Sequence, residues 1–429
     1  MRPLPLGIQT FKKIIRENYL YIDKTKEIYK LITSGNAYFI SRPRRFGKSL
    51  LVSILKEIFT GNKELFRGLY IYDKLDWKKY PVINIDFTEI TYSQKKDIFV
   101  KTPIDRLIET GKEYDINLEN KNILKSAFRE LIKKLSKIEK VVLLIDEYDK
   151  PIIDLITDKK QAMANREILR EFYSVLKSCD EYIKFAFLTG VSKFSKVSIF
   201  SGLNNLEDIT LDKKFSTILG ITEKELKIYF SDYMAVAADK NKSNKKEMLQ
   251  KIKEWYDGYS WDGEKKLFNH HSILSFFKLQ SFGNYWFSTG TPAFLIKLIR
   301  EENYELTNIE KVTVSEYIFD SYDIENMDLT SLLFQTGYLT IESIDKKDRL
   351  YTLTSPNSEV KESLLNYLLG NYIDKNVSAV KPLYIDLRKS LEKEDLQKAI
   401  QIVRTIFAGI PYTLHIEKES YYHSPYFIC

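Results

Sequence analysis

The stretch Ala37 to Ser49, AYFISRPRRFGKS, decides the fold of this chain, because an apolar strand there runs into a loop that ends in Gly47-Lys48-Ser49. In such a loop the glycine lets the backbone approach a phosphate, the lysine ammonium lies between the terminal phosphates, and the serine hydroxyl binds Mg²⁺. Apolar residues at helical spacing follow directly after Ser49. The order of strand, loop and helix predicts a phosphate-binding loop of the Walker A type.

The match to that loop is incomplete. Arg42 stands where the general signature has its first glycine, and Pro43 removes one backbone N–H from the loop. A basic turn between a strand and a helix is therefore the alternative interpretation. A second motif at the right place in a sheet decides between the two.

That second motif is Val141 to Glu147, in which five apolar residues end in two acids. A continuous Val/Leu/Ile run is typical of a strand buried on both faces of a parallel sheet, and ligands collect at the carboxyl ends of such strands. Asp146 is then the Walker B carboxylate that holds Mg²⁺, and Glu147 orients or deprotonates the attacking water. A buried strand followed by a solvated acidic turn is the alternative.

Two further strands are predicted at residues 81–87 and 183–190, with a helix between Asp146 and Thr189. The alternation of strands and helices predicts an α/β fold, a P-loop NTPase-like parallel sheet flanked by helices. Thr189, at the end of the strand after the acids, is the candidate sensor of the γ-phosphate. Thr189 as a plain strand end is the alternative.

These motifs give a set of predicted site residues with ATP and Mg²⁺ as cofactors. Lys48, Glu147 and Thr189 are the predicted catalytic residues, and Ser49 and Asp146 the predicted metal ligands. The predicted nucleotide-binding residues are Arg44, Arg45, Phe46, Gly47, Lys48, Ser49 and Leu50. The guanidinium groups of Arg42, Arg44 and Arg45 are candidates for contacting the nucleotide or another polyanion.

Several longer runs carry a family resemblance: residues 21–25, 41–49, 146–151, 188–196, 202–206, 208–210, 255–259 and 285–292. Together they resemble the AAA-ATPase-like family of prokaryotic proteins, in which the loop begins with Arg-Pro-Arg-Arg rather than glycine. The resemblance spans nearly the whole chain. It implies ATP binding by a P-loop domain that is usually joined to a C-terminal nuclease-like domain of the PD-(D/E)XK type.

The C-terminal segment, residues 409–429, looks like the opening helix of that nuclease-like domain. A nuclease of this type needs two carboxylates to hold a metal and a lysine to assist water. After Asp395 the sequence contains no aspartate. We therefore expect an incomplete, inactive nuclease-like remnant in a truncated or naturally shortened relative.

The remaining sequence divides into regions that follow a P-loop domain at residues 1–215. A capping box at Thr222 and Glu225 and two helical apolar stripes predict a helical lid or small domain at residues 216–290. For residues 291–408 the sequence predicts a helical and winged-helix-like region. The pattern from Leu332 to Leu353 is typical of a helix end, a strand, a charged turn and a second strand. A last amphipathic helix runs from Leu391 to Phe407.

Composition is typical of a cytoplasmic protein that does not span a membrane. The 66 basic and 59 acidic residues leave a net charge of +7, too small an excess to indicate nucleic-acid binding by itself. The only two cysteines, Cys179 and Cys429, give no disulfide framework, and the start lacks the apolar core of a signal peptide. The four histidines form no zinc motif and are interpreted as structural or surface residues.

Three functions remain open on the sequence alone. The first is a Mg²⁺-dependent ATPase, and the second a non-hydrolysing, nucleotide-dependent scaffold. The third is an ATP-regulated DNA-binding module. The sequence leaves open a DNA or protein partner and the assembly of an oligomer.

Overall fold

The computed structural model describes residues 1–91, 96–156, 158–193, 206–287, 295, 310–319, 328–372 and 377–408. Its centre is a sheet of parallel strands in the order β2-β3-β4-β1-β5. The strands are β1 (Ala37–Ser41), β2 (Val82–Asp86), β3 (Val141–Asp146), β4 (Ile183–Gly190) and β5 (Glu207–Asp208). The predicted α/β class is confirmed, and β4 lies between the strand of the phosphate loop and the strand of the two acids.

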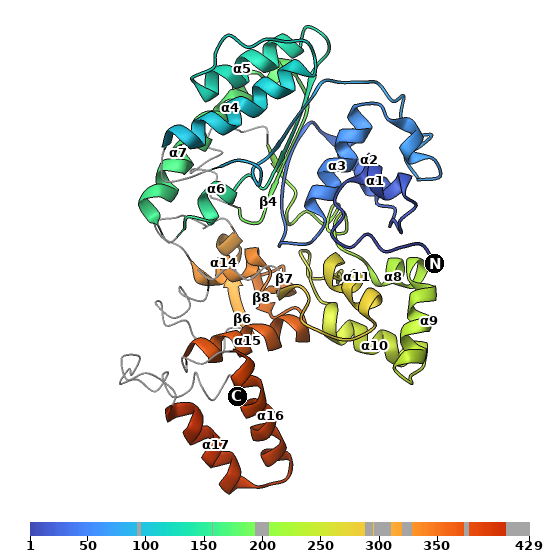
Figure 1. Ribbon diagram of the computed structural model, residues 1–429, viewed down its shortest axis with the longest axis vertical. Coiled ribbons are helices and arrows are strands. Elements are labelled where there is room, and N and C mark those ends of the chain that lie inside the picture. The colour runs from blue at the N-terminus through green and yellow to red at the C-terminus, as the bar shows by residue number, and fades with distance from the viewer. Residues whose placement is uncertain are drawn as a thin grey trace.

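Both faces of this sheet are covered by helices, as Figure 1 shows. Successive residues of β3 point to opposite faces, so that Leu143 packs in one apolar cluster and Leu144 in another. The first cluster contains residues of α4 (Lys96–Lys112), α5 (Leu124–Leu135) and α7 (Lys159–Ser178). The second contains residues of α1 (Phe11–Arg16), α2 (Thr25–Ser34) and α3 (Lys48–Phe59). Burial on both faces is why the β3 sequence is apolar without alternation.

A helical region follows the sheet and has an apolar cluster of its own. Its helices are α8 (Glu223–Tyr229), α9 (Ser231–Lys240), α10 (Lys245–Tyr256) and α11 (His270–Leu279). The predicted capping box is confirmed, since the Thr222 side chain accepts from the Glu225 N–H and the Glu225 carboxylate accepts from the Thr222 N–H. The helix that starts at this capping box ends at Phe230, whose backbone leaves helical geometry, and α9 follows directly. The aromatic residues of this region form its core.

The third region holds a small antiparallel sheet in the order β6-β8-β7. Its elements are β6 (Val312–Ser315), α14 (Leu329–Thr336), β7 (Thr340–Asp345), β8 (Leu350–Thr354) and α15 (Ser358–Tyr372). The predicted sequence of helix, strand, charged turn and strand is confirmed, and β6 adds a strand that the pattern did not indicate. In Figure 1 this region lies beside the helical region and below the parallel sheet.

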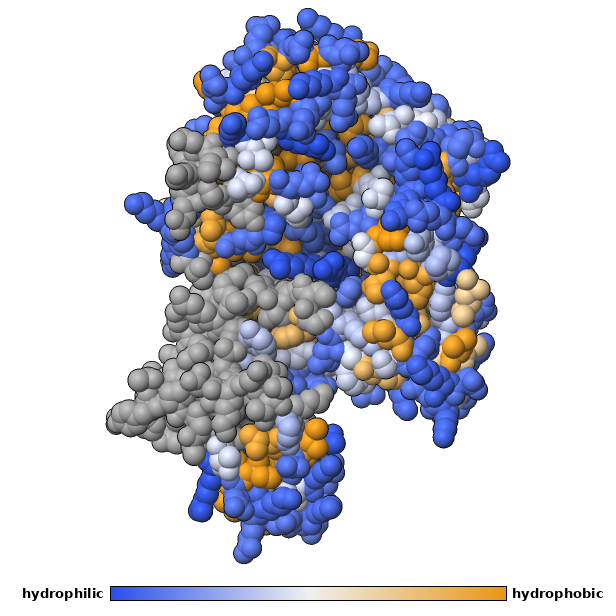
Figure 2. All heavy atoms as spheres, viewed as in Figure 1, coloured by the Kyte–Doolittle hydropathy of each residue, from blue (hydrophilic) through white to orange (hydrophobic). Residues whose placement is uncertain are grey.

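The last two helices, α16 (Val377–Glu392) and α17 (Leu396–Ala408), form a hairpin at the lower end of Figure 1. The single helix predicted from Leu391 onward is wrong, because a turn at residues 393–395 separates Leu391 from the rest and Asp395 accepts the Lys398 N–H. Leu391, Leu396 and Ile400 are each more than half exposed, and Figure 2 shows apolar atoms gathered at this end of the molecule.

Some predicted features lie outside the described residues. They are the motif residues 194–205 and 288–292 and the nuclease-like segment 409–429. Within the ranges that are described, no helix is both long enough and apolar enough to cross a lipid bilayer.

Candidate functional site

The phosphate loop connects β1 to α3 and turns at Gly47. Gly47 has φ of +90° and is the residue before the first helical turn of α3, a conformation that favours glycine over any residue with a side chain. Arg45 also has positive φ, at +68°. The loop therefore ends in a tight turn that directs the N-terminus of α3 toward the sheet edge where β3 ends.

Lys48 lies inside this loop and is almost completely buried, with 4% of its surface exposed. Its ammonium donates to the backbone carbonyls of Arg42 and Pro43, at 3.1 and 3.3 Å. The same Nζ lies 3.3 Å from Glu147 Oε1. The loop thus folds around the lysine, and the lysine meets the second motif.

The two acids follow β3 and face the start of α3. The Ser49 hydroxyl donates to the Asp146 carboxylate, which is 2% exposed. Burial and the nearby Glu147 charge raise the pKa of Asp146 to about 7, and the Ser49 bond and the Lys48 charge act in the opposite direction. Glu147 has φ of +50° and its side chain is 20% exposed. The structure therefore brings together four residues predicted from the two motifs: Lys48, Ser49, Asp146 and Glu147.

These oxygens fit a magnesium ion bound together with a phosphate. Mg²⁺ is held in phosphate-binding sites by one or two protein oxygens, waters and the phosphates themselves. Ser49 and Asp146 supply such oxygens side by side, and Asp86, at the end of β2, is close enough to raise the Asp146 pKa. Among the described residues no group of three or more His, Cys, Asp or Glu side chains could hold a metal.

Hydrogen bonds that join Tyr148 and Asp149 to the residues that follow β4 fix the turn that carries the two acids. Asp149 accepts from the backbone N–H groups of Val191 and Ser192, at 3.1 and 2.6 Å, and the Tyr148 hydroxyl donates to the Ser192 carbonyl at 2.8 Å. A Cβ at Gly190 would lie 2.3 Å from an Asp149 oxygen, so no larger residue fits there. Burial, and then the Glu147 charge, raise the pKa of Asp149 to about 6. Motif spacing had given Asp149 and Gly190 no role.

Thr189 lies at the end of β4, between the two motif strands. It pairs with Ile40 of β1, and its carbonyl accepts the Tyr148 N–H at 3.1 Å. Its hydroxyl is buried and has no hydrogen-bond partner. An unpartnered buried hydroxyl is consistent with a sensor and also with a strand end, so the role of Thr189 stays a prediction.

The arginines of the loop point in different directions. Arg42 is turned into the core, where its guanidinium lies 4.0 Å from the centre of the Trp261 ring and donates to the Thr210 carbonyl. Burial lowers the pKa of Arg42 to about 9. Arg42 is therefore a structural residue, and its expected contact with a polyanion is wrong. Arg44 lies near Asp154, with 3.7 Å between their charged atoms, and Arg45 is exposed.

Phe46 also faces the core. Its ring packs edge-on against Tyr259 and Trp261, with no exposed surface. The Phe46 side chain therefore faces away from the cavity, and nucleotide binding by Phe46 stays a prediction for its backbone. The aromatic contacts anchor the loop to the segment after α10, a long-range contact that the local sequence does not indicate.

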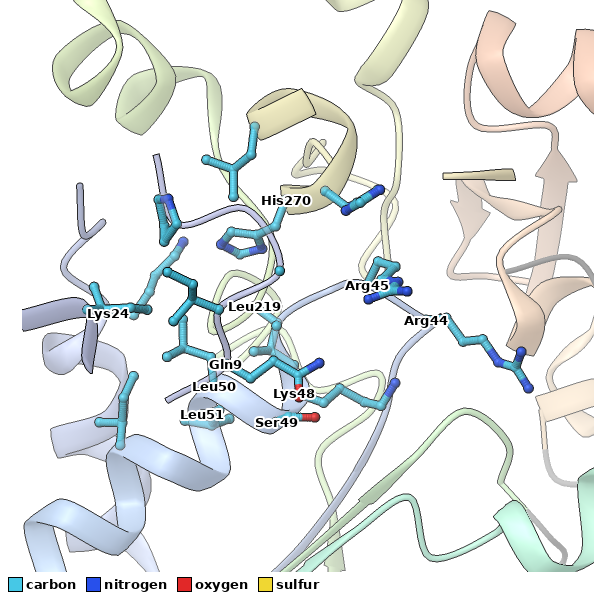
Figure 3. A pocket seen from close by; sticks show the side chains of 18 of the residues that line it. Gln9, Lys24, Arg44, Arg45, Lys48, Ser49, Leu50, Leu51, Leu219 and His270 are labelled. Atoms are coloured by element: carbon cyan, nitrogen blue, oxygen red, sulfur yellow. The ribbon is translucent and has the colours of Figure 1, made fainter. Parts of the chain in front are cut away.

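A cavity of about 320 Å³ opens beside the loop. Five predicted loop residues, Arg44, Arg45, Gly47, Lys48 and Ser49, line it together with Leu50 and Glu147. Figure 3 shows the side chains of Arg44, Arg45, Lys48, Ser49 and Leu50 around the cavity, together with those of Gln9, Lys24, Leu219 and His270. The sequence motifs assigned no role in the site to these additional lining residues, among them Leu6, Gln9, Lys24, Leu219 and His270. Phe46, Asp146 and Thr189 do not line the cavity.

Comparison with known proteins gives two matches. The family described as "Predicted AAA-ATPase" matches residues 5–200, which include both motifs. A protein of Azotobacter chroococcum mcd 1, named "Uncharacterized protein in vnfD 5'region", is 37% identical over 437 residues, covering 99% of this chain and 82% of that protein. The chain belongs to the predicted AAA-ATPase family. Membership agrees with the parallel sheet and supports a nucleotide-binding, ATPase-like character.

Proposed function

We propose that this AAA-ATPase-like protein binds ATP with Mg²⁺ at the phosphate loop and hydrolyses it. The observation that carries the proposal is the position of Lys48. Its ammonium is buried within the loop, 3.3 Å from Glu147, and the neighbouring Ser49 bonds to Asp146. Phosphate oxygens entering the loop would replace the carbonyl partners of Lys48 with stronger, charged ones.

Each predicted residue has a role in this proposal. Lys48 binds the terminal phosphates, and Ser49 and Asp146 hold the Mg²⁺, which neutralises charge on the phosphates when bound. Glu147 orients the attacking water and accepts its proton. Thr189 contacts the γ-phosphate, and the backbone from Arg44 to Leu50 surrounds the phosphate chain.

The adenosine part of ATP fits the remainder of the cavity. Away from the charged loop residues the cavity wall is apolar, with Leu6, Ile22, Leu50, Leu219 and Leu274. A purine ring gains from burying its faces against such side chains. The N-terminal segment and the start of α11 would thus enclose the base from two sides.

The test compares three variants for ATP binding and for phosphate release. We expect Lys48→Ala to weaken binding by at least about a hundredfold, because it removes a buried cation from the phosphate chain. Glu147→Gln should bind ATP and lower turnover by about a hundredfold or more. Lys56→Ala, an exposed lysine on the same helix, is the matched control and should behave as wild type. Normal ATP binding by Lys48→Ala would contradict the proposal.

A non-hydrolysing scaffold is the second candidate, and one contact favours it. Glu147 is paired with Lys48 rather than free to act as a base. Wild-type protein that binds ATP without turnover, alone and with DNA, would support the scaffold. Salt-sensitive DNA binding that changes with ATP would instead support the DNA-binding module.

The division into four regions and the inactive nuclease-like end are likewise proposals. Residues 409–429 lie outside the described residues, and these residues contain no aspartate that could serve as one of the two metal-binding carboxylates of such a nuclease. Incubation of supercoiled DNA with the protein and Mg²⁺ tests this. Cleavage that persists in Lys48→Ala would contradict it.

A further inference from the structure

His270 lies where the helical region meets the phosphate loop. It is the first residue of α11, and its ring atoms Cε1 and Nδ1 are 3.5 Å from where a Cβ would lie on Gly47. Figure 3 shows the imidazole reaching from α11 toward the loop, above Leu219 and Lys48. The ring thus lies beside Gly47, the residue before the first turn of α3, and the N-terminus of a helix attracts anions.

The His270 ring has a free hydrogen-bonding atom in this position. The Phe46 backbone interacts with the ring and acts to raise its pKa, while the Nδ1 atom itself is buried without a partner at hydrogen-bond distance. A buried polar atom left without a hydrogen-bond partner is destabilising, so its presence in a native structure requires an explanation. A ligand that supplies the missing partner is one such explanation, and the ring lines the cavity where a ligand would bind.

The charges around His270 keep the ring neutral until a ligand arrives. Burial, and then the positive charge of Lys24, lower the pKa of His270 to about 4, and Glu225 of α8 acts weakly in the opposite direction. Lys24 and Glu225 form an ion pair at 2.7 Å, and Arg45 acts on the neighbouring His271. A neutral imidazole still carries one N–H donor, which can be placed on Nδ1.

The start of α11 adds to the attraction for an anion. Asn269 caps this helix by accepting from the N–H groups of His271 and Ser272, so the positive end of the helix dipole is directed at the cavity. The phosphate loop and α11 therefore present two helix N-termini to one cavity. His270 is the side chain placed between them.

We propose that His270 donates a hydrogen bond from Nδ1 to the phosphate chain of the bound nucleotide, and so makes the helical region a nucleotide-contacting element. The inference rests on the proposed ATP binding. It assigns a binding role to a histidine that sequence patterns treated as structural.

The test measures the affinity of wild type, His270→Ala and His270→Gln for ATP, ADP and adenosine by calorimetry. We expect His270→Ala to weaken ATP and ADP binding about threefold to tenfold while adenosine binding is unchanged. His270→Gln, which keeps an N–H donor, should restore part of the loss. Lys278→Ala, on the exposed part of the same helix, is the matched control and should equal wild type.

A second measurement follows the ring directly. The chain has four histidines, so its imidazole NMR spectrum is simple, and the His270 signal is the one missing in His270→Gln. ATP should shift that signal more than adenosine does. Equal affinity of wild type and His270→Ala for ATP would overturn this inference and leave the proposed function standing. An equal loss of affinity for ATP and for adenosine would do the same. Failure of wild type to bind ATP would overturn the proposed function and this inference with it.

Discussion

Glu359 offers a prediction whose size follows from the structure. This acid begins α15, is 1% exposed, and accepts hydrogen bonds from the Ser272 hydroxyl and the Trp286 backbone N–H, both at 2.7 Å. Burial raises the pKa of Glu359 from 4.5 to about 7, against the effect of these bonds. The carboxyl group thus joins α11, Trp286 and α15 while it holds a proton near neutral pH.

The sign of the resulting pH dependence follows from proton binding. Between pH 4.5 and about 7 the folded protein retains a proton on Glu359 that the unfolded chain has released. Its contribution to the free energy of unfolding is therefore complete below pH 4.5 and is lost as pH rises to about 7. The full loss is about 3 kcal/mol.

Glu359→Gln should remove this pH dependence and keep the contacts. A glutamine oxygen can accept from Trp286 N–H, and its amide can donate to the Ser272 hydroxyl. We expect the stability of Glu359→Gln relative to wild type to increase by about 2 kcal/mol between about pH 5.5 and about pH 8. The assay is thermal unfolding of both proteins at both pH values, with Glu254→Gln, an exposed glutamate, as control. A stability difference that does not change with pH would refute the reasoning.

Two further substitutions test how the site is supported. Asp149→Ala leaves the buried N–H groups of Val191 and Ser192 without their acceptor. We expect the free energy of unfolding to fall by about 2–4 kcal/mol, as measured by thermal unfolding, and ATP turnover to fall as well, with Asp149→Asn intermediate. Wild-type stability of Asp149→Ala would contradict this. Gly337→Ala places a Cβ 2.7 Å from Pro43 on a residue whose φ is +93°. Although Gly337 lies outside the cavity, we expect this substitution to displace the loop and weaken ATP binding measured by calorimetry. Unchanged affinity would show that the loop tolerates the added methyl group.

The parallel sheet was predictable because its strands carry their signal in their own residues. The five apolar residues before Asp146 are buried on both faces, and no neighbouring segment is needed to recognise them. Residues 183–190 were likewise predicted with the bounds that β4 has. The meeting of Lys48 with the acids was also predictable, since the carboxyl ends of parallel strands share one edge of the sheet.

The errors arise where a side chain's direction or a helix end depends on distant contacts. Arg42 and Phe46 belong to the loop motif, yet both turn inward because Trp261 offers each of them a ring face or edge. The end of α8 at Phe230 has no glycine or proline to mark it. His270 has no motif partner in the sequence and enters the cavity only because α11 begins at the loop.

The phosphate loop is held from behind by Trp286 and by the end of α14, as well as by the sheet. Trp286 Nε1 donates to the Arg44 carbonyl at 3.0 Å, and Gly337, at the end of α14, packs against Pro43. Glu359 holds the Trp286 backbone in turn. Two contacts from distant parts of the chain, one at Arg44 and one at Pro43, therefore hold the backbone of the loop in place.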